Sequence, residues 1–413
     1  MSGKNKVIVL AKIFILILIG FNMQAINYYP FFYQPRIFFG EPRLARSWLT
    51  SIDINVRGGH ALNGFDGNGN QVNALAIYGC ENLHVITQNV PQEILDCNEE
   101  CLLNNLWRHE SNSLCFGKLA ITGKCSAMEF LPVITQNFAN GFFASLSIPI
   151  KKVSIKDLFF NDLTPRESLA PDIAFMPWQT TMNNIEYNMC RYGVYLGPSK
   201  NKGLGDIQLL GGWTFNYEDT TTVDYIDFTL AAGINIPTSH IASSNAPWCL
   251  PLGYEGHIGI PLVVTASSGI FDWLTVGVQT GALWFNTKQR IVSIKTACDQ
   301  QGWISLVRAS ARVKKGTNWH IDEYLKLDHL IGGFSLVLGF AHDHANQTRF
   351  ANSTQRELPW TMTAFNFMLE CDFATFKHPN APRLAFTIDK VIHGKRIMDT
   401  ALFGSYLGVD FEW

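Results

Sequence analysis

The sequence has little charge and, beyond its N-terminus, no long apolar run. Charged residues make up 16% of the 413 residues, against about 25% in a typical globular domain. Gly, Pro, Asn or a charge interrupts every later apolar stretch, so none of these stretches is a candidate for a spanning helix of about 20 residues. The net charge of −2 gives no indication of nucleic-acid binding.

Motifs of common enzyme and metal sites are also absent. The sequence contains no G-x-S-x-G, Gly-rich phosphate loop, H-E-x-x-H or C-x-x-C pair. His342 and His344 point to one face of a strand, but a metal site needs more ligands than these two. We expect no catalytic residues, no metal and no cofactor, although distant residues could still assemble a triad in space.

Aromatic residues, in contrast, reach 13% of the chain. Low charge and high aromatic content without a spanning helix are typical of a β-barrel with a lipid-facing band and aromatic girdles. A secreted β-sandwich that binds glycans through exposed Trp and Tyr has a similar composition. It is the main soluble alternative.

The N-terminus has the pattern of a secretory signal peptide. Lys4, Lys6 and Lys12 precede or flank the apolar run 13–19, and Ala25 offers a small residue for cleavage. The run is shorter than a spanning helix requires, which disfavours a membrane anchor. We therefore divide the chain into a signal peptide (1–25), an N-terminal segment (26–47) and a β domain (48–413).

Alternating residues predict long strands in the C-terminal half. In 224–236, Ile226, Phe228 and Leu230 face one way, whereas Asp227 and Thr229 face the other. Strands of about 10–15 residues are longer than those of globular proteins and fit tilted membrane-spanning strands. The further expected strands are 205–217, 256–267, 272–286, 303–314, 330–343, 360–374, 381–391 and 401–413. Segment 315–329 is too long for the short inner turn that this scheme needs.

The first half is less regular. Strand 48–58 should turn Asp53, Asn55 and Arg57 inward. The long Cys-containing segment 59–114 should include a helix near 92–108, and it could form an external cap or a plug in the lumen. Further strands are expected at 114–123, 126–136, 141–156 and 185–197. The fold class is thus all-β: an antiparallel transmembrane β-barrel of about 12 strands (12–14), with a long partly helical segment after the first strand.

The last strand is apolar at alternate positions and ends on an aromatic residue. It resembles the terminal strand of bacterial outer-membrane β-barrels of the porin type. The resemblance implies that four residues form the signal read by the barrel-assembly machinery: Leu407, Val409, Phe411 and Trp413.

A second resemblance concerns residues 203–290. Gly203-Leu204-Gly205-Asp206 opens one strand, and the next ends in Ile236-Pro237-Thr238 before a long loop. This order is similar to the outer-membrane transporters linked to meta-pathway phenol degradation, whose architecture is related to that of the fatty-acid transporters. Ser239 stands where that family has Gly. The resemblance implies passage of small apolar molecules across the outer membrane.

Charged residues at inward positions are the candidate pore lining. They are Asp53, Arg57, Asp227, Arg308, Arg312, Lys314, Glu370, Asp372, Asp410 and Glu412. Basic and acidic residues on different walls would create a transverse field that orients polar solutes. Alternatively, the charges pair across the lumen and only stabilise the barrel.

Nine cysteines in an exported chain suggest disulfides. Cys249 and Cys298 fall in neighbouring outer loops and are predicted to form a bridge, with Cys190 as a partner for an unmatched cysteine. Cys371 should face lipid as a free thiol. The full candidate set is Cys80, Cys97, Cys101, Cys115, Cys125, Cys249 and Cys298.

Three functions fit these features. The first is an outer-membrane channel or transporter for passive diffusion of small solutes. The second is a structural or adhesive surface protein with a filled barrel, and the third is the secreted sandwich. The first two place the protein in the outer membrane of a Gram-negative bacterium. Its expected partners there are outer-membrane lipid, the barrel-assembly machinery and a small-molecule solute, with no nucleic acid.

Overall fold

The computed structural model describes residues 48–88, 117–164, 180, 182–218, 223–271, 273–295, 300–331, 333–350, 356–373 and 382–412. The predicted signal peptide (1–25), the segment 26–47 and the predicted helix near 92–108 lie outside these residues.

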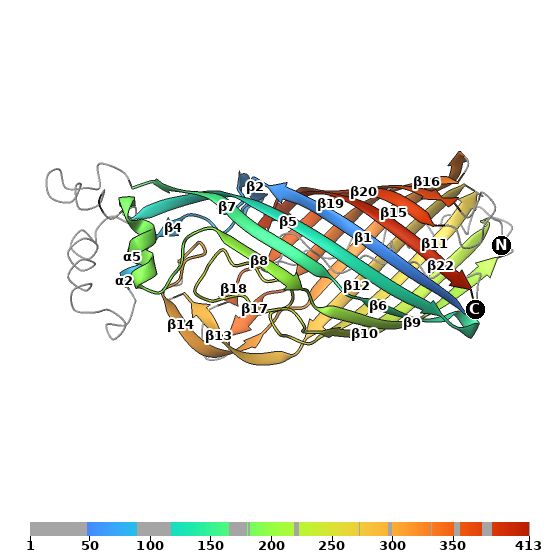
Figure 1. Ribbon diagram of the computed structural model, residues 1–413, viewed down its shortest axis with the longest axis horizontal. Helices are drawn as coiled ribbons and strands as arrows, with labels where there is room; N and C mark the ends of the chain where they lie inside the picture. The colour runs from blue at the N-terminus through green and yellow to red at the C-terminus, as the bar shows by residue number, and fades with distance from the viewer. Residues whose placement is uncertain are drawn as a thin grey trace, which may run out of the picture.

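Twelve antiparallel strands close into a barrel, because β1 pairs with the last strand, β22, on one side and with β5 on the other (Figure 1). β6 and β7 form one wall strand broken at Ile148-Pro149, and β8 and β9 form another broken at Gly205-Asp206. The prediction of an antiparallel barrel of about 12 strands is confirmed. In chain order the wall strands are β1 (Leu49–Ala61), β5 (Lys118–Asn137), β6 (Phe142–Ser147) with β7 (Ile150–Asp162), β8 (Ser199–Leu204) with β9 (Ile207–Glu218), β10 (Tyr225–Ile236), β11 (Gly259–Phe271), β12 (Leu274–Phe285), β15 (Asn318–Ile331), β16 (Phe334–Ala345), β19 (Trp360–Asp372), β20 (Arg383–Lys395) and β22 (Ala401–Glu412).

The barrel is polar inside and apolar outside. On β10, Phe228 and Leu230 are 38% and 42% exposed, whereas Thr229 between them is 8% exposed. A sandwich in water would bury the apolar face instead. Exposed apolar rows on a closed barrel are the arrangement that lipid requires, so the alternative of a soluble sandwich is wrong.

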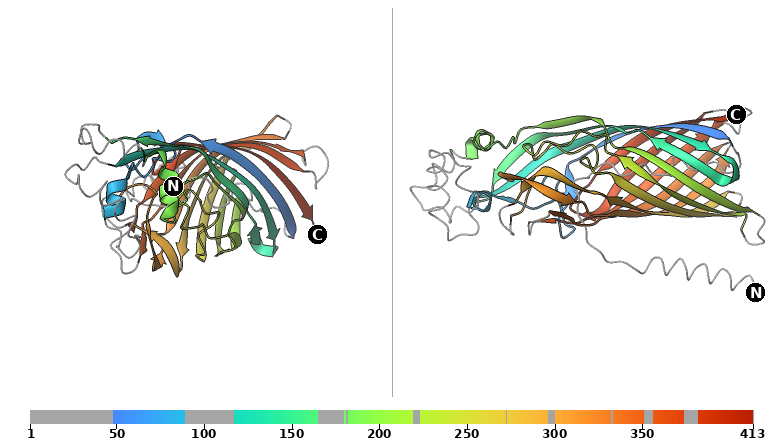
Figure 2. Two further views of the ribbon diagram at one scale, coloured as in Figure 1. Left: turned by 60° about the vertical axis from the view of Figure 1, so that its left-hand side comes forward. Right: turned by 90° about the horizontal axis from the view of Figure 1, so that it is seen from below.

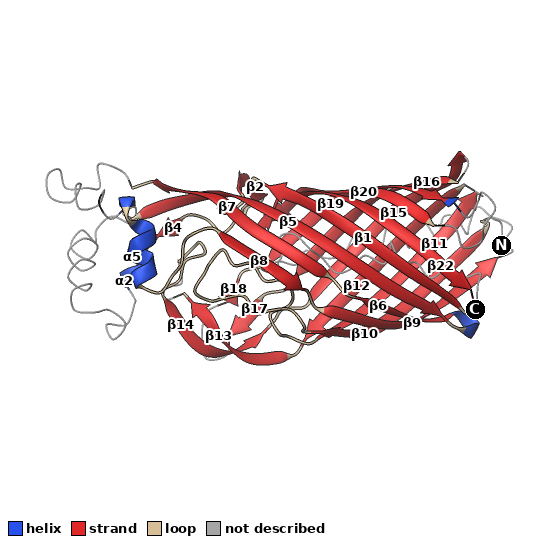
Figure 3. Cartoon of the chain, viewed as in Figure 1, coloured by secondary structure: helices blue, strands red, loops and turns tan. Residues whose placement is uncertain are grey.

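The two ends of the barrel differ in their connections. At the end that holds the C-terminus, the turns are short, such as the 3-10 turn η4 (Ala139–Gly141) and the turn between β15 and β16. At the other end, which we call the outer end, the connections are long and carry all the remaining elements (Figures 1 and 3). They are β2 (Asn63–Phe65), β3 (Gln71–Asn73), β4 (Glu81–Asn82), α2 (Leu83–Gln88), α5 (Ile185–Arg191), β13 (Thr287–Ile294), β14 (Val307–Lys314), β17 (Thr348–Phe350), β18 (Arg356–Glu357) and β21 (Ile397–Met398). Among the described residues, no helix is long and apolar enough to cross a membrane.

Segment 303–314 was predicted as a wall strand, and this prediction is wrong. Its strand, β14, pairs with β13 and β17 in a separate four-stranded outer sheet, β13-β14-β17-β18. The wall strand is β15, which begins at Asn318 in the segment 315–329 that did not fit the expected turn and ends at Ile331. Alternation indicates that a segment is a strand, but it does not indicate which strand the segment pairs with. For this reason 303–314 was assigned to the barrel wall.

Smaller corrections concern the first half. The two strands expected at 114–123 and 126–136 are one long strand, β5. Segment 185–197, expected as a strand, contains the helix α5. The strand β8 follows it and was not among the expected strands.

An apolar core fills the outer end of the molecule. β5 and β7 extend beyond the rest of the wall toward α2 and α5 (Figures 1 and 2). Val153 and Ile155 of β7 pack in one cluster with residues from several outer connections, including Leu75, Trp248 and Ile304. The outer connections therefore form a packed body rather than separate loops.

Candidate channel lining and outer rim

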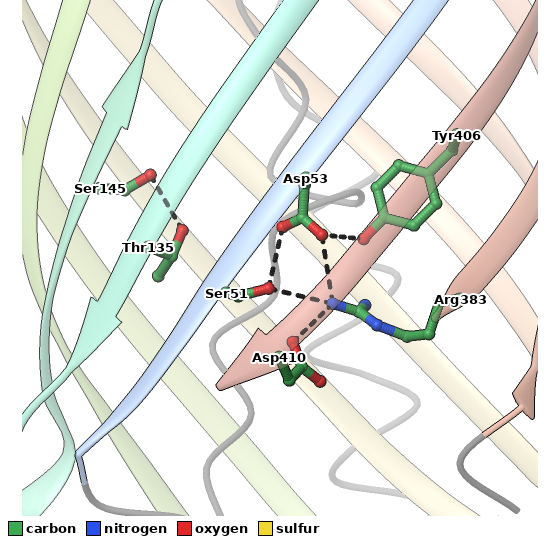
Figure 4. Close-up of polar contacts among 7 residues, drawn as sticks. All are labelled: Ser51, Asp53, Thr135, Ser145, Arg383, Tyr406 and Asp410. Carbon is green, nitrogen blue, oxygen red and sulfur yellow. Dashed lines mark hydrogen bonds and ion pairs between the residues drawn. The ribbon is translucent and has the colours of Figure 1, made fainter. Parts of the chain in front are cut away.

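Two ion-paired clusters line the inner face of β1 and its neighbours. In the first cluster, Arg383 Nη2 lies 3.1 Å from Asp53 Oδ1 and 3.0 Å from Asp410 Oδ1. The same nitrogen donates to Ser51 Oγ at 3.0 Å, and the hydroxyl of Tyr406 donates to Asp53. Figure 4 shows the five side chains converging from β1, β20 and β22.

The second cluster lies further along β1, toward the outer end. Arg57 Nε is 2.6 Å from Glu129 Oε2, and its Nη1 is 3.3 Å from Asp389 Oδ2. Lys151 Nζ lies 3.5 Å from the other oxygen of Glu129. Arg57 and Glu129 are only 5% and 2% exposed, and buried charges of this kind must be paired.

The first cluster joins two of the predicted pore-lining residues, Asp53 and Asp410, and the second cluster contains a third, Arg57. The two clusters interleave acidic and basic groups on adjacent strands rather than separating them on opposite walls. On this arc of the wall, the charged side chains form ion pairs with one another and have polar neighbours. Thr135 and Ser145, whose hydroxyls are 3.2 Å apart, continue the polar surface on β5 and β6 (Figure 4).

The other predicted lining residues are scattered. Asp227 lies on the inner face of β10, and Glu370 and Asp372 lie on that of β19; all three are partly buried. Glu412 is on β22, but its side chain is outside the described part. Arg308, Arg312 and Lys314 belong to β14 in the outer sheet, so the expected basic wall of the lumen is not formed by them.

Sequence reasoning missed the partners of these charges. Arg383 and Asp389 lie on a predicted strand, and Glu129 and Lys151 lie on two others, each at an inward position of its alternation. The alternation could have identified them as inward residues. Which strands are neighbours, and in which register, could not be read from it.

At the outer rim, Asp206 holds both ends of the connection between β10 and β11. Its Oδ1 accepts the backbone N–H of Ser239 at 3.0 Å, and its Oδ2 accepts that of Tyr254. Thr238 Oγ1 donates to the carbonyl of Gly205 at 2.6 Å and accepts the N–H of Ile207 at 3.1 Å. The two motifs that carry the family resemblance thus meet in space and fasten loop 237–258 to the break between β8 and β9.

Behind this clamp lies a buried charge network. Glu255 is 3.0 Å from Arg290 and 3.5 Å from Lys315. It borders a cavity of about 70 Å³ between loop 237–258 and β13, which is also lined by Ser243, Trp303 and Ser305. This cavity could hold a few water molecules.

His257 ends the loop just before β11 and is 0% exposed. Its Nδ1 is 2.8 Å from the carbonyl oxygen of Asn286, so Nδ1 carries the proton in this contact. Burial lowers the pKa of His257 to about 4, and the nearby cations Lys315 and Arg290 act in the same direction. The histidine is therefore neutral at physiological pH.

The cysteines form no bridge among the described residues. Cys80, Cys125, Cys190, Cys249 and Cys371 are free thiols. Cys125 is fully buried in the apolar core of the outer end, which explains its presence without a disulfide. Cys97, Cys101, Cys115 and Cys298 lie outside the described part. Because Cys249 is a free thiol, the prediction of a bridge between Cys249 and Cys298 is wrong. No group of three metal-ligating side chains occurs within the described ranges.

The terminal strand has the expected faces. Leu407 and Phe411 are exposed on the outside of β22, at 39% and 42%, and Val409 lies between them on the same face. Trp413 lies outside the described part. The assembly signal remains a prediction.

Comparison with known proteins identifies the fold. No family model matches the chain, and no curated protein matches it either. Among solved structures, an outer-membrane channel from Pseudomonas putida F1 is similar with a TM-score of 0.50 and 10% identity, covering 89% of this chain and 96% of that one. The chain therefore has the fold of an outer-membrane β-barrel channel.

Other barrels are less similar. The translocator domain of the autotransporter NalP from Neisseria meningitidis has a TM-score of 0.40 and 10% identity, covering 92% of this chain and 93% of that one. The monoaromatic hydrocarbon channel CymD has a TM-score of 0.32 and 7% identity, with 89% of each chain covered.

Proposed function

We propose that the protein is an outer-membrane channel through which small solutes diffuse passively. The observation that carries this proposal is the inverted burial of a closed barrel, with apolar rows outside and charged, hydrogen-bonded side chains inside. A polar interior offers hydrated solutes a path that the lipid does not. The barrel fold shared with a known channel agrees with this assignment.

The outer connections act as a filter in this proposal. Loop 237–258, fastened by Asp206, and the described part of segment 59–114 both contribute to the apolar core at the outer end. A solute must pass these connections before it reaches the ion-paired wall at β1. On this basis we assign the role of a cap to these outer connections. That apolar molecules pass through the channel follows only from the family resemblance.

Planar-bilayer recording tests the proposal. The full-length protein, refolded in detergent and shown to be heat-modifiable on a gel, should give discrete conductance steps in potassium chloride. Swelling of proteoliposomes in a small sugar and uptake of a small phenol would then separate polar from apolar solutes. The interior variant Glu129→Gln should change ion selectivity, whereas Glu186→Gln on the exposed surface of α5 should not.

A structural or adhesive surface protein is the second candidate. The packed outer body, with fully buried Leu83 and Trp248, favours this function because a channel does not require so large a core. A heat-modifiable barrel that never conducts would favour this second function over the channel.

A further inference from the structure

Five exposed lysines gather on the outward face of β5, β7 and β8. They are Lys124, Lys152, Lys156, Lys200 and Lys202, and we call them the lysine patch. None of them forms an ion pair in the part of the chain that the structure describes. The patch is separate from both interior clusters, because the side chains of those clusters point to the opposite face of the same wall.

The strand register places the patch directly beyond the lipid-facing rows. Ile150 lies opposite both Phe130 of β5 and Leu204 of β8, and all three are exposed apolar residues. Two residues further along β7, Lys152 lies opposite Lys202. On β7 and β8 the change from apolar to basic therefore occurs within one row, at the side toward the outer end. On β5 the exposed Met128 lies opposite Lys152, so the change comes one row later there.

The remaining rows complete the lysine patch around a pair of serines, of which Ser154 is only 5% exposed. Ser154 lies opposite both Ser126 and Lys200, and the two serine hydroxyls are 2.8 Å apart. The next row pairs Lys156 with Lys124. The lysines thus surround two hydroxyl groups on three adjacent strands.

Such a group is unfavourable unless an anion binds to it. Two pairs, Lys152 with Lys202 and Lys156 with Lys124, are directly opposite partners on one face, with Cβ atoms typically about 5 Å apart. Like charges in this arrangement repel and destabilise the sheet. Lysine side chains next to an apolar belt can lay their methylene groups on it and extend their ammonium groups to the headgroup level.

We propose that the lysine patch binds the phosphate groups of a lipid headgroup in the outer leaflet. The inference rests on the membrane location in the proposed function, but not on conduction. The acyl chains would contact the row of Phe130, Ile150 and Leu204, while the phosphates contact the ammonium groups above it. Attraction between basic residues and anionic headgroups is the physical basis.

A second basic surface provides a matched control. Arg312, Lys314 and Arg349 lie on one exposed face of the outer sheet, with Lys314 opposite Arg349. This sheet is separated from the wall by breaks at Asn286 and at 315–317. The row next to Arg312 holds one exposed apolar residue, Ile291 opposite Ser310, and not an apolar row across three strands like the one beside the lysine patch.

The test measures binding of bisphosphorylated lipid A to the full-length protein in detergent micelles, with dephosphorylated lipid A and inorganic phosphate as comparison probes. The triple variant K152Q/K156Q/K202Q should bind lipid A on the order of tenfold or more weakly. The control R312Q/K314Q/R349Q should bind within about twofold of the unmodified protein, and K152R/K156R/K202R should retain binding because it keeps the charge.

Three results of these binding comparisons would overturn the proposal. They are an equal loss in both neutralised triples, equal binding of the dephosphorylated lipid, or full displacement by inorganic phosphate at the same concentration, which would indicate a site for a soluble anion. Absence of lipid A binding by a heat-modifiable, membrane-inserted protein would also overturn the proposal, but it would not contradict the proposed channel function. Failure to insert into membranes would instead contradict the proposed function.

Discussion

Asp206 binds the backbone N–H of Ser239 at a distance of 3.0 Å, although 33 residues separate them in the chain. Asp206 closes the Gly-Leu-Gly-Asp motif, and Ser239 directly follows the Pro-Thr pair at the end of the next long strand. The Cβ of a residue at Gly253 would lie 2.3 Å from the same carboxylate, so only glycine fits there. These motifs therefore have a structural role: they fix loop 237–258 at the outer rim.

Removing this carboxylate should release the loop. In Asp206→Ala both backbone donors lose a charged acceptor, and each such hydrogen bond is worth about 1.5–3 kcal/mol. We expect protease cleavage within loop 237–258 to become faster in the intact, heat-modifiable barrel. Asp206→Asn keeps one acceptor oxygen and should give an intermediate rate. Cleavage of Asp206→Ala at the rate of the unmodified protein would show that other contacts hold the loop.

Arg383 should be important for barrel stability. Arg383→Met leaves Asp53 and Asp410 close together without their cation, and breaking a buried pair in this way costs about 3–5 kcal/mol. The temperature at which the heat-modifiable band is lost should fall clearly. The control is Lys390→Gln, because Lys390 is 41% exposed in its pair with Asp399 and exposed pairs contribute only about 0–1 kcal/mol. Equal effects of the two variants would contradict the stabilising role of the interior cluster.

Much of the barrel was predictable because membrane strands repeat one strong pattern. The 224–236 strand shows this best, since every second residue must be apolar to meet lipid, and the structure exposes Ile226, Phe228 and Leu230. The outer sheet was not predictable by the same means. β14 alternates like a wall strand, but it pairs with β13 and β17 and not with the wall.

The interior partners were hidden for a different reason. The inward position of Asp53 follows from the alternation of β1, but its partner Arg383 is 330 residues away. The partner of a charged residue in a barrel can be predicted only when the circular order and the register of the strands are known. The sequence pattern contains neither the strand order nor the register. It therefore left open whether acidic and basic residues lie on different walls or form ion pairs.

His257 makes the attachment of loop 237–258 sensitive to acid. Burial holds the pKa of His257 near 4, below its usual 6.5. An unfolded or released loop would take up a proton at higher pH than the docked loop, so docking is fully stable above about pH 6.5 and weakens as the pH falls toward 4. Protease cleavage of the loop should accelerate over this window.

Two substitutions test whether His257 causes the acid sensitivity. His257→Asn keeps an N–H donor for the carbonyl of Asn286 but does not titrate, so it should flatten the pH dependence of cleavage. His240 is exposed in the same loop, and His240→Asn should leave the pH dependence as it is. An unchanged slope in His257→Asn would assign the acid sensitivity to another group.

Glu81 should make the stability of the neighbouring outer connections depend on pH in the direction opposite to that of His257. Its carboxylate is 2% exposed and accepts the backbone N–H groups of Trp303 and Ile304, the latter at 3.2 Å. Burial raises the pKa of Glu81 to about 7, although these hydrogen bonds and Lys295 oppose the increase. The folded state therefore favours the protonated form of Glu81. The contribution of Glu81 to stability is complete below about pH 4.5 and is lost as the pH rises through 7.

Hydrogen exchange can measure this contact directly. After correction for the intrinsic exchange rate, protection of the Ile304 amide should decrease between pH 5 and pH 8. Glu81→Gln is neutral at every pH and keeps an acceptor oxygen, so its protection should stay constant across this range. Glu186→Gln, an exposed substitution on α5, should behave like the unmodified protein. If Glu81→Gln lost protection with the same slope as the unmodified protein, the carboxyl group would not be the cause, because the variant has no proton to release there.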